Sequence, residues 1–143
     1  MSRRSRAREV ALQTLYRMEV SGGESADLEA AHRFHKGRLQ SAPLIAFADA
    51  LVEGVLTSQA DLDAVIDAKS QNWRLSRMAA TDRAVLRIAA FELLHSDTPG
   101  PVVIDEAIDL ARRYGSEASS RFVAGILGGI LQDHDGRPRP AAG

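Results

Sequence analysis

The sequence predicts an all-α fold, and three observations lead to this prediction. Apolar residues recur at three- and four-residue spacing through almost the whole chain, and no segment alternates with the two-residue period of a strand. Glycine, proline and capping residues divide this pattern into about seven segments. The composition, with 45% hydrophobic and 26% charged residues among 143, is that of a compact folded chain.

The first two helices are expected in the N-terminal forty residues. The first covers about residues 4–20 and presents small and large apolar residues on one stripe. Gly22 and Gly23 are expected to end it. The second begins after a cap at Ser25 or Asp27, although its apolar pattern is poor.

The third and fourth helices have clearer signals. Ser41 followed by Pro43 is typical of an N-cap and an early-turn proline. The helix that they open has a broad apolar face, which contains Leu44, Phe47, Ala48, Leu51, Val52 and Val55. A shorter helix is expected over residues 59–69, and Trp73 after it is interpreted as a residue that plugs the core.

Three more helices are expected in the second half. Thr81 can cap the fifth, which contains the most hydrophobic run of the chain. The prolines and glycine within residues 97–101 end it, so the sixth is expected to start near Val102 and to stop at Gly115. The seventh covers about residues 119–131. Short connections favour two antiparallel bundles, one on either side of the connection near residues 69–81.

Two features inside these helices need an interpretation. Glu92 lies near the centre of an apolar stripe, and a buried carboxylate must find hydrogen-bond donors or become protonated. We interpret it as holding the two bundles together, either in an internal ion pair or with a helix end as its partner; a socket for a partner helix is the remaining option. Gly125 and Gly129 are four residues apart in the last helix and are interpreted as a small-residue pair that admits another backbone.

Charge is unevenly distributed, although the net charge is only −1. Residues 1–17 contain five arginines and one acidic residue, so the remaining chain carries an excess of five negative charges. A basic end can attract a polyanion while the rest of the surface stays available to another partner. On charge alone, a solvated and fraying terminus is the simpler interpretation.

Residues that could support catalysis are few. The absence of cysteine excludes disulfide frameworks, thiolate metal sites and cysteine nucleophiles, and it favours the cytoplasm. No nucleophile elbow, Walker loop or dinucleotide fingerprint is present. His32 and His35 have the spacing of a shared metal face but lack a third ligand, and we interpret them as surface residues. We expect neither export nor a membrane span, and no catalytic residue, metal or cofactor.

Four strings carry a resemblance to a known family. They lie in register over residues 3–127 and read RRSRAREVALQTLY, TDRAVLRIAAFELL, VVIDEAIDLARRYGSE and SSRFVAGIL. Together they resemble the NusB family of bacterial transcription antitermination factors. The resemblance implies two three-helix subdomains, at about residues 1–70 and 71–132, followed by a loose tail at residues 133–143.

The resemblance also implies a function without catalysis. Proteins of this family pair with NusE, a ribosomal protein, and bind the single-stranded boxA element of nascent ribosomal RNA transcripts. The complex then joins other Nus factors on RNA polymerase and suppresses termination. Whether the free protein forms a homodimer, in which self-association covers the arginines, is left open at this point.

The resemblance, carried over position by position, also implies two RNA-contacting segments that meet in one groove. The first consists of Arg3, Arg4, Arg6 and Arg8. The second, at the start of the last helix, contains Glu117, Ser119, Arg121 and Phe122. Phe122 is equally compatible with a stacking face and with a core position, and Ala118 stands where related proteins often carry an aspartate. Pairing with NusE is expected to involve Tyr16, Asp82 and Arg83.

Two alternatives stay open. One is a NusB-like domain of a ribosomal RNA methyltransferase, which is disfavoured because no segment is expected to hold a methyl donor. The other is a helical interaction domain that binds no RNA.

Overall fold

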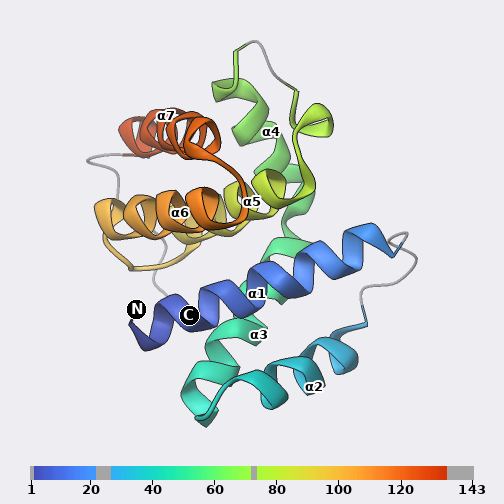
Figure 1. Ribbon diagram of the computed structural model, residues 1–143. Helices are drawn as coiled ribbons and strands as arrows, with labels where there is room; N and C mark the ends of the chain where they lie inside the picture. Colours follow the sequence, from blue (N-terminus) through green and yellow to red (C-terminus); the bar gives the residue numbers. More distant parts are fainter. Residues whose placement is uncertain (1, 22–26, 72–73, 135–143) are drawn as a thin grey trace.

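The computed structural model describes residues 2–21, 27–71 and 74–134, and this part of the chain consists of helices and their connections without a strand, which confirms the all-α prediction (Figure 1). The elements are α1 (Arg3–Val20), α2 (Leu28–Arg38), α3 (Ala42–Thr57), α4 (Gln59–Lys69), the 3-10 turn η1 (Leu75–Arg77), α5 (Ala80–His95), α6 (Gly100–Tyr114) and α7 (Glu117–His134). The expectations for Gly22, Gly23, Ser25, Trp73 and the tail at residues 135–143 fall outside the described residues.

Side-chain caps fix two of the helix starts as predicted. The Asp27 carboxylate accepts a hydrogen bond from the Ala30 backbone N–H at 3.0 Å, at the start of α2. The Ser41 hydroxyl accepts one from the Leu44 N–H at 3.4 Å, at the start of α3. Both satisfy N–H groups that have no partner within the first helical turn.

The starts of the last three helices differ from the prediction. Thr81 is not a cap, because α5 already begins at Ala80. The helix α6 begins at Gly100, before the expected start near Val102, because Pro101 fits a first helical turn, where a missing N–H costs nothing. The helix α7 is longer than expected at both ends and covers Glu117–His134.

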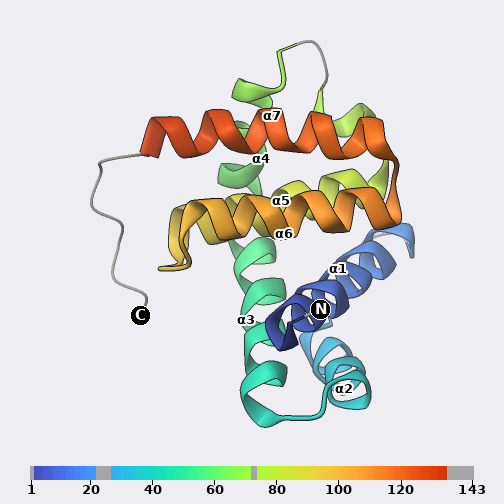
Figure 2. The same cartoon turned by 60° about the vertical axis from the view of Figure 1, so that its left-hand side comes forward.

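The helices pack in two groups around α5 (Figures 1 and 2). The helices α1, α2 and α3 lie against one another at one end, and α4, α6 and α7 lie with α5 at the other. Because α4 packs mainly on α5 and α7, it belongs spatially with the C-terminal helices. The subdomain boundary near residue 70 stays a prediction.

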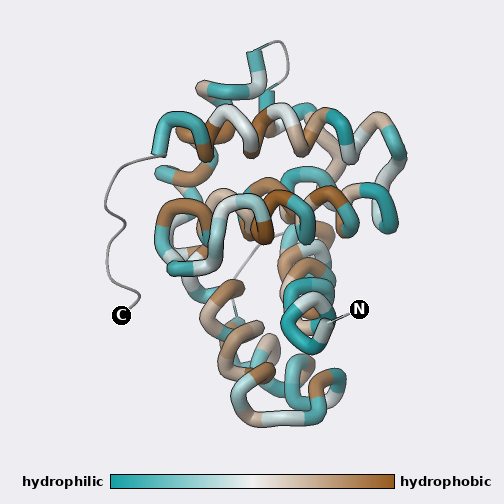
Figure 3. The backbone as a smooth tube through the Cα atoms, turned by 90° about the vertical axis from the view of Figure 1, so that its left-hand side faces the viewer, coloured by the Kyte–Doolittle hydropathy of each residue, from teal (hydrophilic) through white to brown (hydrophobic). Residues whose placement is uncertain are grey.

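The core follows from amphipathic helices whose apolar stripes face α5. Hydropathy alternates along each helix (Figure 3), and one large cluster of buried residues extends from α1 through α5 to α7. Gly54 of α3 lets that helix approach α5, because a Cβ there would collide with the ring of Phe91. The expectation for Gly125 is wrong, since a Cβ at that position would meet open space. Gly129 faces the Lys69 side chain instead of a backbone.

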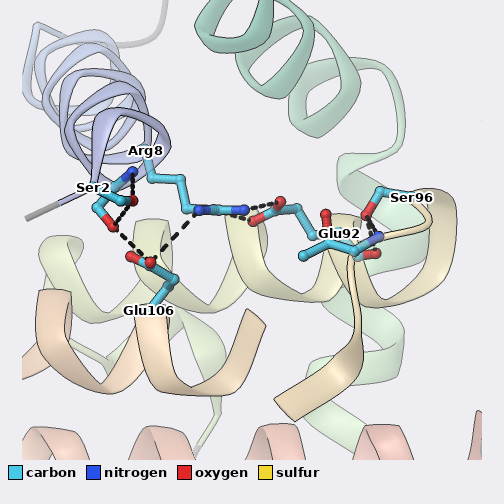
Figure 4. A network of polar contacts seen from close by, with 7 residues as sticks. Ser2, Arg8, Glu92, Ser96 and Glu106 are labelled. Atoms are coloured by element: carbon cyan, nitrogen blue, oxygen red, sulfur yellow. Dashed lines mark hydrogen bonds and ion pairs between the residues drawn. The ribbon is translucent and has the colours of Figure 1, made fainter. Parts of the chain in front are cut away.

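A buried ion pair connects α1 to α5 (Figure 4). Arg8 is 3% exposed and Glu92 is 2% exposed. The Arg8 Nε donates to Glu92 Oε2 at 2.7 Å, and Nη2 donates to Oε1 at 2.9 Å. A second carboxylate, that of Glu106, lies 3.8 Å from Arg8 Nη1. The prediction that Glu92 joins the two helical groups through an ion pair is therefore confirmed.

Removing one partner of this pair is expected to be costly. Arg8→Ala leaves the Glu92 carboxylate buried without its two donors, so we expect a loss of about 3–5 kcal/mol in the free energy of unfolding. The double variant Arg8→Met/Glu92→Leu removes both charges and is expected to recover most of this loss. Urea denaturation followed by circular dichroism measures both. A loss below about 1 kcal/mol for Arg8→Ala would contradict the assigned role.

Candidate nucleic-acid interface

The structure removes Arg8 from any surface that RNA can reach. Its guanidinium is enclosed between α1 and α5 and is occupied by Glu92. Burial lowers the pKa of Arg8, but the hydrogen bonds and charge of Glu92, with the charge of Glu106, raise it above its ordinary value. The RNA contact expected of Arg8 does not fit this position, because breaking the pair would leave a buried carboxylate unpaired.

Arg3 and Arg4, in contrast, are exposed at the start of α1. The Arg4 guanidinium lies 4.9 Å from the centroid of the Phe47 ring of α3, and Arg8, one turn later, lies 5.1 Å from the same ring. A guanidinium stacked on an aromatic face keeps its N–H edges available to other acceptors. The sequence placed Phe47 in the core and gave no sign of this stacking.

The Glu9 carboxylate, also on α1, holds the end of α6 against this helix. It accepts hydrogen bonds from Arg6 on its own helix and from Arg113 Nη1 at 2.5 Å. Next to it, Gln13 Nε2 donates to the Tyr114 hydroxyl at 3.0 Å. Burial raises the pKa of the Glu9 carboxyl, but the hydrogen bonds from Arg113, Arg6 and Tyr114 outweigh this and lower it.

The second expected segment begins directly after α6. Ser116 caps α7 by accepting a hydrogen bond from the Ser119 N–H at 3.0 Å. Glu117 accepts a hydrogen bond from Arg112 Nε at 2.7 Å, so its carboxylate is tied to the last turn of α6. Arg121 is exposed, one turn further along α7.

A hollow of about 350 Å³ lies between the start of α5 and the start of α7. Its lining consists of Arg77, Met78, Asp82, Ser116, Ala118, Ser119 and Phe122. Phe122 packs against the main core and also lines this hollow, so its position is compatible with both interpretations that the sequence left open. Arg77 and Met78 were not predicted, because only the fold brings the η1 turn to this place.

Asp82 is the residue at which the two expected binding surfaces meet. Its carboxylate accepts a hydrogen bond from the Ser119 hydroxyl at 3.1 Å. Burial raises the pKa of Asp82, and the Ser119 hydroxyl offsets part of this effect. A residue expected at the NusE surface therefore lies beside one expected at the RNA surface.

The other two residues expected at the partner surface lie near the same corner. Tyr16 is 40% exposed on α1. Arg83 is half-buried, and its Nε donates to Glu19 Oε1 at 2.8 Å, while its Nη1 donates to backbone carbonyls around η1. Glu19 follows Tyr16 by one helical turn, so the Arg83–Glu19 pair fixes this end of α1 at the start of α5, while the Tyr16 side chain lines a hollow with Phe34 and Arg38 of α2.

The two segments that are expected to contact RNA are connected to each other through the end of α6. The bonds from Arg6 and Arg113 to Glu9 fix α1 beside the end of α6, and the bond from Arg112 to Glu117 continues to the start of α7. Both ribbon views show the turn between α6 and α7 next to α1 (Figures 1 and 2). A continuous surface between the two segments is therefore geometrically possible.

The histidines do not form the surface pair that the sequence suggested. His35 is completely buried, and its ring nitrogens contact the Thr14 hydroxyl at 2.8 Å and Asp49 Oδ1 at 2.6 Å. His32 is exposed and contacts the other oxygen of Asp49 at 2.6 Å. The described residues contain no cluster of three or more ligating side chains suited to a metal ion. They also contain no helix with the length and apolar character needed to cross a membrane.

The hydrogen bonds to Glu9 predict a pH-dependent contribution to stability. Because the folded-state pKa is below the ordinary value of 4.5, the contribution is present above that value and is lost as pH falls through the folded-state pKa. Glu9→Gln is expected to lose about 1 kcal/mol at neutral pH, since Arg6 and Arg113 are partly exposed. In urea denaturation at a series of pH values, the difference from wild type should shrink below pH 4.5. A pH-independent difference would contradict this assignment.

Comparisons with known proteins agree on one family. The profile described as the NusB family matches residues 5–132. The transcription antitermination protein NusB of Anaeromyxobacter dehalogenans is 50% identical over 127 residues, which cover 88% of each chain.

Two solved structures extend this similarity to the fold. NusB of T. maritima superposes with a TM-score of 0.80 at 33% identity, over 94% of this chain and 93% of the other. A structure of antitermination factors NusB and NusE in complex with dsRNA superposes with a TM-score of 0.79 at 26% identity, over 93% and 98%. The family profile covers most of the chain, and half of the aligned residues are identical to those of a known NusB. The chain therefore belongs to the NusB family.

Proposed function

We propose that this protein is a transcription antitermination factor that pairs with NusE and binds single-stranded boxA RNA in nascent ribosomal RNA transcripts. In this proposal it acts in the cytoplasm, joins other Nus factors on RNA polymerase and catalyses no reaction. Family membership supports the proposal, as does a similar solved structure that contains NusB, NusE and RNA together.

One observation carries the RNA-binding part of the proposal. Arg3 and Arg4 are exposed at the start of α1, and the bond from Arg113 to Glu9 joins this helix to the end of α6, which leads into the α7 segment beside the Phe122 hollow. A single strand that contacts both needs no rearrangement of the helices. Arg6 is in the same surface, although part of its charge is directed at Glu9.

The chemistry of these groups suits an unpaired strand better than a duplex. Guanidiniums neutralise phosphates without regard to sequence, whereas an aromatic face binds a base only when that base is unstacked. Phe122 could supply such a face, worth about 1–3 kcal/mol per base. Ser119 and Asp82 line the same hollow with groups that can donate to and accept from a base edge, and Glu117 and Arg121 flank it.

Pairing with NusE is assigned to the corner formed by Tyr16, Asp82 and Arg83. The Arg83 guanidinium donates its hydrogen bonds to Glu19 and to backbone carbonyls, so the role assigned to Arg83 is to position this corner rather than to contact NusE itself. Asp82 and the exposed Tyr16 ring supply an acid and an aromatic face for a basic ribosomal protein. The homodimer of the free protein stays a proposal, which light scattering would test.

Removing the two exposed arginines should weaken RNA binding selectively. For Arg3→Ala/Arg4→Ala we expect lower affinity for boxA RNA and a salt dependence reduced by up to about 0.7 log unit per lost phosphate contact. Filter binding measures both, with a scrambled single strand and a boxA duplex as competitors and with or without NusE. Arg8 is left in place, so stability is preserved.

The matched control for this experiment is Arg33→Ala/Lys36→Ala. It removes the same charge from exposed positions of α2, a helix that contributes no residue to either expected RNA segment. It should leave boxA affinity and salt slope nearly unchanged. Equal effects of the two double variants, or none, would show that the basic start of α1 is an ordinary solvated terminus.

Asp82 is expected to contribute to NusE pairing through its charge. Asp82→Asn keeps an acceptor for the Ser119 hydroxyl but removes the carboxylate, so the fold should be preserved while NusE affinity falls and becomes less sensitive to salt. Isothermal titration calorimetry with purified NusE measures the affinity, and circular dichroism controls for folding. Unchanged affinity would remove Asp82 from the interface.

A further inference from the structure

A second basic and aromatic hollow lies between α1 and α2, apart from the Phe122 hollow. It has a volume of about 500 Å³ and is open to solvent. Its lining consists of Gln13, Tyr16 and Arg17 from α1 and Phe34 and Arg38 from α2. None of these residues carries a carboxylate, so the hollow is positively charged although the chain as a whole is not.

Two arginines stack on one ring in this hollow. The guanidinium carbons of Arg17 and Arg38 lie 4.5 Å and 4.8 Å from the centroid of Phe34. Phe34 itself is half-buried against the small cluster of apolar residues between α1, α2 and α3, so the ring is fixed by the fold. Stacking of this kind restricts a guanidinium but leaves its N–H edges free to bind an anion.

These two arginines differ from the other arginines that the fold holds in place. Arg8, Arg83 and Arg87 each donate two hydrogen bonds to a carboxylate of a neighbouring helix. Among the described residues, no carboxylate lies within ion-pair distance of Arg17 or Arg38. Two unpaired cations beside one ring repel each other, and a bound anion would relieve this repulsion.

The hollow continues the basic surface at the start of α1. Arg6, Gln13 and Arg17 are spaced by seven and four residues, so they lie along one face of the helix. Arg17 is eleven residues beyond Arg6, which is roughly 17 Å along the axis. A strand that contacts the N-terminal arginines can therefore reach Arg17 by following α1.

We propose that Arg17, Phe34 and Arg38 form a second site for single-stranded RNA, which holds nucleotides that flank the boxA element. This inference rests on the proposed function, which supplies the identity of the RNA. The two guanidiniums bind phosphate, and the Gln13 amide can hydrogen-bond a base edge. Tyr16, on the rim, is shared with the expected NusE surface, so flanking RNA would pass beside the bound partner.

The proposal predicts an effect that depends on RNA length. Binding of the full chain is measured by fluorescence anisotropy with a boxA oligonucleotide and with a longer one that extends it on both sides. Wild type should bind the longer RNA more tightly. Arg17→Gln/Arg38→Gln should lose about fivefold or more in affinity for the longer RNA, keep its affinity for the short one, and show a smaller salt slope with the longer RNA.

The matched control is Arg33→Gln/Lys36→Gln. It removes two exposed cations from the same helix, outside the hollow. It should leave the advantage of the longer RNA intact. An equal loss in the control would overturn the site, as would an unchanged advantage in Arg17→Gln/Arg38→Gln whose circular dichroism spectrum matches wild type.

Two further probes separate this inference from the proposed function. If poly(U) binding depends on Arg17 and Arg38 while boxA is bound no better than a scrambled strand, boxA recognition fails and the second site stands. If wild type binds neither RNA, both fail. If a poly-glutamate peptide binds in an Arg17- and Arg38-dependent manner and longer RNA has no advantage, the hollow takes acidic protein segments and the RNA proposal is overturned.

Discussion

The buried ion pair between Arg8 and Glu92 is the constraint on which the arrangement of this protein depends. It joins the N-terminal helix to the helix at the centre of the other group, through two hydrogen bonds in an apolar environment. An apolar contact tolerates small shifts, but a shift of this pair would leave charge unpaired at a cost of several kcal/mol. The position of α1 on α5 is therefore specified by electrostatics as well as by packing.

The interface follows from that position. With Arg8 directed inward, Arg4 reaches the Phe47 ring, and Glu9, the next residue, faces α6 and binds Arg113. In this one segment, Arg8 therefore points into the core, Glu9 binds α6 and Arg4 is exposed to solvent. Arg3 and Arg4 are held at exposed positions because Arg8, on the same helix, is buried and paired with Glu92.

The sequence predicted the helices and the need of Glu92 for a partner, because periodicity and burial are local properties of a segment. It did not predict that Arg8 is the partner, since the arginines near the N-terminus have equivalent local sequence signals. The buried role of His35 and the stacking of Arg17 and Arg38 on Phe34 were missed for the same reason: each depends on a contact between helices distant in sequence. The interpretation of Gly125 failed because spacing alone does not show which face of α7 meets a neighbour.

Asp82 links the two proposed binding events. A base that takes the Ser119 hydroxyl as its partner would leave the half-buried Asp82 carboxylate with one donor fewer, at a cost that burial increases. A cation from NusE beside Asp82 would remove that cost. By linkage, each ligand would then increase the affinity for the other by the same factor. Under the proposed function, this geometry favours binding of RNA and NusE together rather than in succession.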